Sequence, residues 1–264
     1  MMGGRPAFRE GPVDRVPPPS LARWTAPPAL TCPAMSRHIV ACGGGGWASE
    51  AGAGPLEDYI LGLVRRERPR VCLIPTASGD SDWVISRFYA SFPADRCEPS
   101  HLPLFRPHPE DPRLRLARQD VVYVCGGSSA NLAAVWAVHG VGAALREAWN
   151  AGVVMSGVSA GAICWFAAGL TNSRGPGFVP IGGLGIASGG FCPHADSDPA
   201  RLVALRALVE SGRMPETLAV DDGAAVHIAD GAPPRLVVGA PGRGARRIGP
   251  RGIDEPLEPL ALAS

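Results

Sequence analysis

Between residues 38 and 166, short apolar runs alternate with stretches in which apolar residues recur every three or four positions. Such runs are typical of buried strands, and the recurring spacing is typical of amphipathic helices. Strands alternating with helices predict right-handed βαβ units and therefore a doubly wound, mostly parallel sheet flanked by helices. The predicted strands are HIVAC (38–42), RVCLI (70–74), VVYV (121–124) and VVMS (153–156).

The helices between these strands are predicted from the same spacing. PLEDYILGLVRRE (55–67) has its apolar residues on one face. SDWVISRFYASF (81–92) is predicted to form a helix capped by Asp80 or Ser81. SANLAAVWAVHGVGAALREAWNAG (129–152) supplies one broken helix or two. AGAICWFAAGL (160–170) is predicted to form the helix that follows the last of these strands.

The periodicity weakens after residue 175, where glycine-rich loops are expected. A helix near 199–210 and a strand near 217–220 follow. The segment AAVHIADGAPPRLVVG (224–239) is then predicted to form a C-terminal β-hairpin.

The two ends of the chain differ from this pattern. Residues 1–35 are proline-rich and show neither hydrophobic period, so they are expected to be a disordered leader, with Met35 as the natural start. Residues 36–249 are expected to form a single α/β catalytic domain. Residues 250–264 contain proline and glycine and are expected to be a flexible tail.

Charge and cysteine content indicate the cellular compartment and exclude some classes of binding partner. The net charge is +1, which favours neither nucleic acid nor a membrane surface, and no apolar run is long enough to span a membrane. The seven cysteines include no C-x-x-C pair, and several lie in apolar runs. We therefore expect a cytoplasmic protein that binds neither nucleic acid nor membranes. A monomer or a homodimer is a separate expectation, which neither charge nor cysteine content determines.

The strongest chemical signal is the segment Gly157-Val158-Ser159-Ala160-Gly161, where a predicted strand meets a predicted helix. G-x-S-x-G at this junction is the pattern of a nucleophile elbow, which raises the serine hydroxyl above the sheet. The glycines are needed because neighbouring backbone leaves no room for side chains. The N–H of Ala160, at the start of the helix, is placed to stabilise an oxyanion.

A nucleophilic serine needs a base and a carboxylate, and two arrangements fit the residues. In the first, His194, in a loop, is the base, and Asp221 or Asp222 at a strand end supplies the carboxylate. In the second, Asp196 or Asp198 precedes His227 in the order seen in α/β-hydrolases. The residues alone do not separate these two arrangements.

Glycines also end two other predicted strands, where ligands bind in open α/β sheets. Gly126-Gly127 is the better candidate for a second oxyanion donor. Gly43–Gly46 fits neither a Walker loop nor the dinucleotide signature, so a nucleotide cofactor is not expected. The spacing of His194, Asp196 and Asp198 does not match a zinc site, and Cys164 is assigned to the core.

Six segments, taken together, resemble one known family. The sequence is similar to the peptidase E (aspartyl dipeptidase) and cyanophycinase family of serine peptidases over residues 38–248. The segments that carry the resemblance are IVACGGGG, VCLIPTASGDSD, VYVCGGSSANL, GVSAGA, CPHAD and DDGAAV.

This resemblance implies a fold like that of class I glutamine amidotransferases, with serine at the elbow. It also implies the triad order serine, histidine, acid, which selects Ser159, His194 and Asp222. By the same resemblance Gly127 and Ala160 supply the oxyanion N–H groups. The resemblance matches Arg201 to an arginine that binds the substrate's aspartate. Ser128, which stands where the family often has asparagine, is a second expected substrate-binding residue.

The resulting expectation is a serine peptidase that cleaves a small peptide, such as an N-terminal aspartyl dipeptide, through an acyl-enzyme without cofactor or metal. One alternative is an α/β-hydrolase-like esterase that uses His227. Another is a non-catalytic, amidotransferase-like binding module.

Overall fold

Seven strands form the larger of two sheets in the computed structural model, which describes residues 36–48, 54–107, 110–230 and 232–260. The expectations for residues 1–35, including Met35, lie outside the described residues. The strand order is β11-β10-β1-β5-β4-β2-β3. The strands are β1 (His38–Cys42), β2 (Arg70–Ile74), β3 (Glu98–His101), β4 (Val121–Val124), β5 (Val154–Val158), β10 (Ala224–Ala229) and β11 (Arg235–Val238).

Strands β1 to β5 run parallel, which confirms the predicted doubly wound sheet. Strands β10 and β11 pair antiparallel as the predicted hairpin, and β10 adds antiparallel to β1. β5 lies in the middle of the sheet and is buried at every position, as its continuous apolar run predicts. β3 is shorter than β5 and less apolar, so its sequence, EPSH, does not predict a strand.

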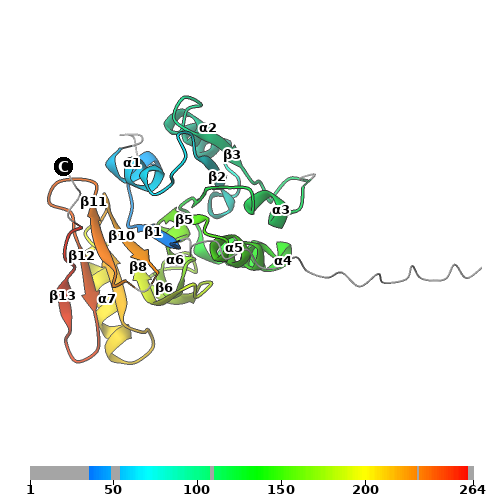
Figure 1. The fold of residues 1–264 in the computed structure, drawn as a ribbon. Coiled ribbons are helices and arrows are strands. Elements are labelled where there is room, and N and C mark those ends of the chain that lie inside the picture. The colour runs from blue at the N-terminus through cyan, green and yellow to red at the C-terminus, as the bar shows by residue number, and fades with distance from the viewer. Residues whose placement is uncertain (1–35, 49–53, 108–109, 231, 261–264) are drawn as a thin grey trace, which may run out of the picture. The chain divides into compact units, whose positions relative to one another are not determined.

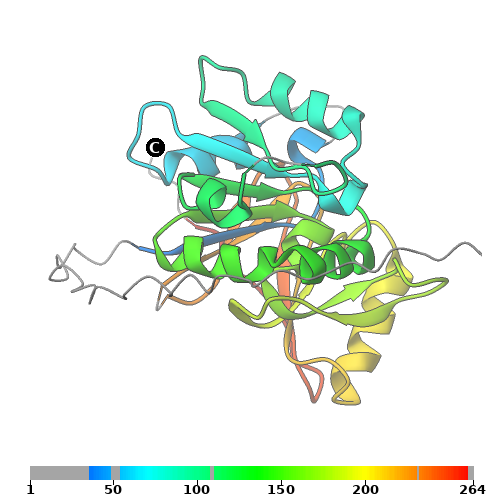
Figure 2. The same ribbon diagram turned by 90° about the vertical axis from the view of Figure 1, so that its right-hand side faces the viewer.

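Helices cover both faces of this sheet (Figure 1). α1 and α2 lie on one side of the parallel strands, and α3, α4 and α5 lie on the other (Figures 1 and 2). Gly140, at φ 66°, separates α4 from α5, so the long predicted segment forms two helices. No helix of the described residues combines the length and apolarity needed to cross a membrane. The helices are α1 (Pro55–Gly62), α2 (Asp82–Ser91), α3 (Pro112–Leu116), α4 (Ser129–His139), α5 (Val141–Asn150), α6 (Ala160–Ile163) and α7 (Pro199–Glu210).

A second sheet, which the sequence analysis did not predict, has the order β13-β12-β9-β8-β6-β7. The predicted helix at 160–170 is wrong beyond Ile163, because Phe166–Thr171 forms β6 and pairs with β8. The loops expected after residue 175 contain β7 and β8. The strands are β6 (Phe166–Thr171), β7 (Val179–Gly182), β8 (Ala187–Cys192), β9 (Thr217–Val220), β12 (Ala245–Ile248) and β13 (Asp254–Pro256).

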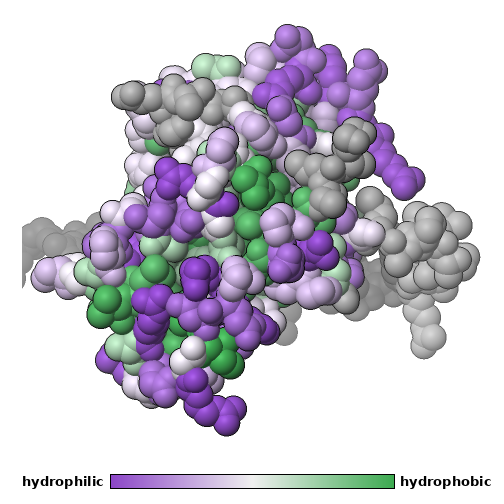
Figure 3. Space-filling view, turned by 90° about the vertical axis from the view of Figure 1, so that its left-hand side faces the viewer, coloured by the Kyte–Doolittle hydropathy of each residue, from purple (hydrophilic) through white to green (hydrophobic). Residues whose placement is uncertain are grey.

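The expected tail also contributes to this sheet. β13 lies within residues 250–264 and pairs antiparallel with β12. Arg246 and Arg247 of β12 form ion pairs with Asp254 and Glu255 of β13. Figure 3 shows the side of the molecule on which β12 and β13 lie in Figure 1; this surface is largely hydrophilic, with smaller hydrophobic patches. The expectation of a flexible tail is therefore wrong for the residues of β13.

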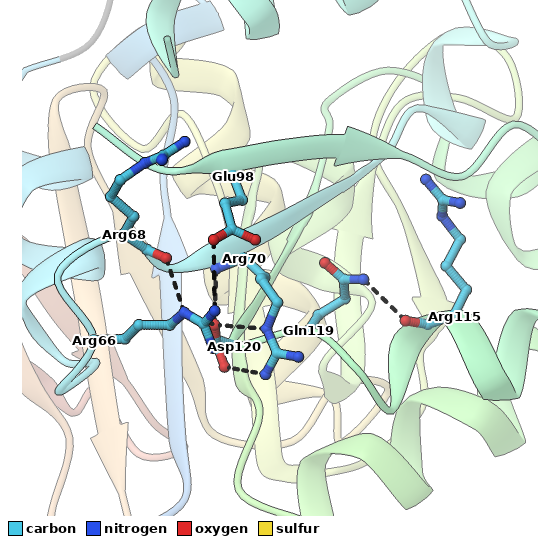
Figure 4. Close-up of polar contacts among 7 residues, drawn as sticks. All are labelled: Arg66, Arg68, Arg70, Glu98, Arg115, Gln119 and Asp120. Carbon is cyan, nitrogen blue, oxygen red and sulfur yellow. Dashed lines mark hydrogen bonds and ion pairs between the residues drawn. The ribbon is translucent and has the colours of Figure 1, made fainter. Parts of the chain in front are cut away.

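An ion pair fixes the starts of two parallel strands (Figure 4). Asp120, before β4, accepts hydrogen bonds from the backbone N–H of Arg70 at 2.8 Å and from its guanidinium at 2.7 and 3.0 Å. Burial alone would raise the pKa of Asp120, but its bonds to Arg70 outweigh this and lower it. The pair holds β2 and β4 in register, so that their carboxyl ends open at the same edge.

Candidate active site

Ser159 follows β5 directly and has the backbone geometry expected at a nucleophile elbow, with φ 56° and ψ −116°. Both neighbouring glycines are required by close backbone contacts. A β-carbon at Gly157 would lie 2.2 Å from the Gly161 carbonyl oxygen, and one at Gly161 would lie 2.2 Å from the Val124 carbonyl oxygen. Ser159 is partly exposed although every residue of β5 is buried.

His194 lies in the loop after β8, and its ring faces Ser159. The distance from His194 Nε2 to Ser159 Oγ is 2.8 Å. The backbone of His194 is left-handed, at φ 55°, and the next residue donates its N–H to the Val220 carbonyl at 3.0 Å. The loop after β8 is therefore bound to the end of β9.

Asp222 follows β9, and its Oδ1 lies 2.6 Å from His194 Nδ1. The hydrogen bond with His194 lowers the pKa of Asp222, although partial burial opposes this effect. The neighbouring Asp221 is turned away and accepts the N–H of Gly244 at 2.9 Å. Burial raises the pKa of Asp221, so of the two carboxylates Asp222 is the one suited to pair with a histidine.

Two backbone N–H groups near Ser159 are available to a ligand. Within the part of the chain that the structure describes, no acceptor pairs with the N–H of Ala160 or of Gly127. Gly127 has φ 138°, and a β-carbon there would lie 2.1 Å from the Ala77 carbonyl oxygen. Glycine is therefore needed at Gly127 for both conformational and steric reasons.

The two residues matched to substrate binding have different surroundings. The hydroxyl of Ser128 accepts the N–H of Asn131 at 3.2 Å, so it caps α4. Arg201, in the first turn of α7, is 7% exposed, and its guanidinium carbon lies 4.5 Å from the centre of the Phe178 ring. Among the described residues no carboxylate forms an ion pair with Arg201, and its Nε is buried without a partner.

His227 does not approach Ser159, so the alternative arrangement with His227 as the base is wrong. Its Nδ1 lies 2.7 Å from the Tyr59 hydroxyl, and its Nε2 lies 3.0 Å from Nδ1 of His38. Asp198, which that arrangement also used, caps α7 through the N–H of Ala200. Burial raises the pKa of the Cys164 thiol, which agrees with its assignment to the core.

The structure also reveals contacts that the sequence analysis missed. Gly44 forms an isolated bridge with Asp222, and its carbonyl accepts the N–H of Gly223 at 2.9 Å. A β-carbon at Gly44 would lie 2.0 Å from Asp222 Oδ1 and 2.6 Å from His194 Nδ1. The glycines after β1 were noted in the sequence as a strand end at which ligands could bind. In the structure, Gly44 instead contacts the His194–Asp222 pair.

A doubly wound α/β fold with hydrogen-bonded serine, histidine and aspartate at its strand ends is typical of hydrolases. Comparison with known proteins gives a narrower class. The chain belongs to peptidase family S51, whose family model matches residues 39–233. It is 46% identical over 191 residues to the uncharacterized peptidase YgaJ of Bacillus subtilis (strain 168), covering 72% of this chain and 83% of YgaJ.

Two solved structures share the fold at low sequence identity. A peptidase from an acI-B1 Actinobacterium superposes with a TM-score of 0.68 at 15% identity, covering 88% of this chain and 98% of that one. A candidate peptidase E from Listeria monocytogenes EGD-e gives 0.57 at 14% identity, covering 76% and 98% respectively. The family resemblance inferred from the sequence is thus confirmed, and the protein is a peptidase of family S51.

Proposed function

We propose that this peptidase is a serine hydrolase that cleaves small peptides through an acyl-enzyme. The observation that carries this proposal is the continuous hydrogen-bonded series from Ser159 Oγ through the His194 ring to Asp222 Oδ1. A hydroxyl is a weak nucleophile, and a base within hydrogen-bonding distance is what activates it. The partial exposure of Ser159 supports direct attack on a bound substrate.

The proposed reaction begins when Ser159 Oγ attacks the peptide carbonyl carbon and His194 Nε2 takes the hydroxyl proton. Asp222 holds the Nδ1 proton and stabilises the imidazolium that forms. The N–H groups of Ala160 and Gly127 donate to the oxyanion. His194 then protonates the leaving amine, and water releases the acyl group by the same steps. Protein groups and water carry every proton, so the scheme requires no cofactor.

We assign Arg201 to recognition of a substrate carboxylate, which favours peptides with an N-terminal aspartate. A buried guanidinium without a carboxylate partner among the described residues retains donors for an acidic ligand. The positive charge of Arg201 also contributes to lowering the pKa of Asp222, after the larger effect of His194, which supports a location near the reacting groups.

The test is labelling by a fluorophosphonate, which reacts with an activated serine, followed by mass spectrometry. Wild type should be labelled at Ser159 and should cleave aspartyl dipeptides. Ser159→Ala should abolish labelling and reduce cleavage by about 10,000-fold or more. Ser211→Ala, which changes an exposed serine at the end of α7, should behave like wild type.

Two histidine variants separate this proposal from its alternatives. His194→Ala should suppress labelling, whereas His227→Ala should leave the labelling rate close to wild type in the folded protein. Full labelling of His194→Ala would contradict the assignment of His194 as the base. A folded wild type that resists labelling and cleaves no peptide would favour a non-catalytic module.

A further inference from the structure

The side chain of Asp196 joins the loop that carries His194 to the loop that carries Asp222. Asp196 lies two residues after His194, and its Oδ1 accepts the backbone N–H of Asp222 at 2.9 Å. This bond crosses from the loop after β8 to the residue that follows β9. It therefore fixes the backbone of Asp222 relative to the loop that presents the histidine.

A third loop completes the connection. Arg243, between β11 and β12, donates to the other carboxylate oxygen of Asp196. The next residue, Gly244, donates its N–H to Asp221 Oδ2 at 2.9 Å and accepts the N–H of Asp221 at 3.0 Å. Hydrogen bonds thus hold Asp222 through Asp196 and the preceding residue, Asp221, through Gly244.

Four further charged residues lie near the His194–Asp222 pair. Asp196, Asp221, Arg243 and Arg201 all act electrostatically on the two consecutive aspartates or bond to them. Asp196 and Arg243 carry opposite charges in direct contact, so together they add little net field at the histidine. Removing either one leaves the other uncompensated beside the pair.

We propose that Asp196 and Arg243 are positioning residues that hold Asp222 against His194 and keep the local charge balanced. This inference rests on the proposed function, because it assigns the pair a role in activating Ser159. The role is distinct from a general contribution to folding, because the two residues should shift the pH dependence of the reaction in opposite directions.

The experiment follows the rate of Ser159 labelling by a fluorophosphonate between pH 4.5 and 9 for wild type, D196N, R243Q and the double variant. Protonation of the base causes the acidic fall of this rate. D196N leaves the Arg243 cation, which disfavours the imidazolium, so the midpoint of the fall should move to lower pH. R243Q leaves the Asp196 anion, which favours the imidazolium, so the midpoint should move to higher pH.

Each shift should be on the order of half a pH unit, and the double variant should return close to the wild-type midpoint. R243K keeps the charge and should also keep the wild-type midpoint.

D196A removes the acceptor for the Asp222 N–H, so its plateau rate of labelling should fall by about tenfold or more, further than that of D196N. D254N, which disrupts the ion pairs of Asp254 with Arg246 of β12 and Arg206 of α7, is the matched control and should leave the profile unchanged.

The outcomes separate this inference from the proposed function. An unlabelled wild type would contradict the proposed function itself. A labelled wild type whose midpoint is the same in D196N and R243Q, or shifts in one direction in both, would overturn the positioning role. If D196N does not fold, R243Q against R243K gives the same test through a side chain that is 43% exposed.

Discussion

Ser159 and His194 both hold left-handed backbone conformations, at φ 56° and φ 55°. Such conformations cost about 1–3 kcal/mol for a residue with a side chain, and they persist only where the surroundings enforce them. Around Ser159 the enforcing contacts are its N–H to the Cys42 carbonyl at 3.1 Å and the packed glycines of the elbow. These two backbone conformations bring the Ser159 hydroxyl and the His194 imidazole into contact, which agrees with the proposed chemistry.

Arg201 is the single residue that we expect to determine the preference for an aspartyl substrate. In a dipeptide library with aspartyl, glutamyl, asparaginyl and leucyl first residues, wild type should prefer the aspartyl peptide. Arg201→Met keeps much of the contact with Phe178 but removes the charge, so kcat/KM for the aspartyl peptide should fall by about 100-fold. The leucyl peptide should change little.

Arg201→Lys is the control for this prediction. It keeps the charge but not the two-pronged donor geometry, so it should give an intermediate loss. Equal losses for all peptides in Arg201→Met would instead indicate that Arg201 supports the fold around α7.

At the scale of elements, the loops after β1, β8 and β9 depend on one another. The loop after β1 approaches the other two through Gly44, which bridges to Asp222. Gly43 packs as closely, since a β-carbon there would lie 2.2 Å from the Asp221 carbonyl oxygen. The glycines after β1 therefore allow backbone to lie against the loops that carry the histidine–aspartate pair.

Gly44→Ala tests this contact. The new methyl group would displace the Asp222 carboxylate or the His194 ring, so the Ser159 labelling rate should fall by about 100-fold while the protein stays folded. Gly62→Ala is the matched control, because nothing lies within 4 Å of its added β-carbon. It should keep full activity, and unchanged labelling in Gly44→Ala would contradict the close contact.

At the scale of the described fold, the candidate site lies where the ends of two sheets meet. Ser159 and Gly44 follow strands of the seven-stranded sheet, whereas His194 and Asp222 follow strands of the six-stranded sheet. His227, in contrast, joins β10 to β1 and α1 through His38 and Tyr59. We therefore expect it to affect stability and not catalysis.

Burial lowers the pKa of His227 from 6.5 to about 4, with a smaller contribution from His38. As pH falls below about 6.5, the unfolded chain binds a proton at this residue that the folded protein does not bind until about pH 4. The free energy of unfolding should therefore decrease over this interval, by up to about 3 kcal/mol from this residue. Urea unfolding at a series of pH values measures it.

His227→Gln should flatten this pH dependence, whatever constant loss of stability it also causes. A wild-type stability that does not change between pH 6.5 and 4.5 would contradict the assignment of a neutral, buried His227.

Hydrophobic periodicity was sufficient to predict the parallel sheet, because each buried strand and each amphipathic helix has its own hydrophobic period. The sequence also placed Ser159 at a strand-to-helix turn, since only glycine fits on either side of that turn. It did not reveal β6, because the apolar residues of 160–171 suit a helix or a buried strand equally well. Pairing with β8, later in the chain, decided between them.

The partners of Ser159 were also decided by tertiary structure. His194 and His227 were both possible bases by residue type, and the family resemblance favoured His194 without giving a geometry. Only the folded chain brings the His194 ring to Ser159 and turns His227 toward Tyr59 and His38. Hydrogen bonding acts over about 3 Å, whereas these residues lie dozens of positions apart, so their contacts follow from how the two sheets meet.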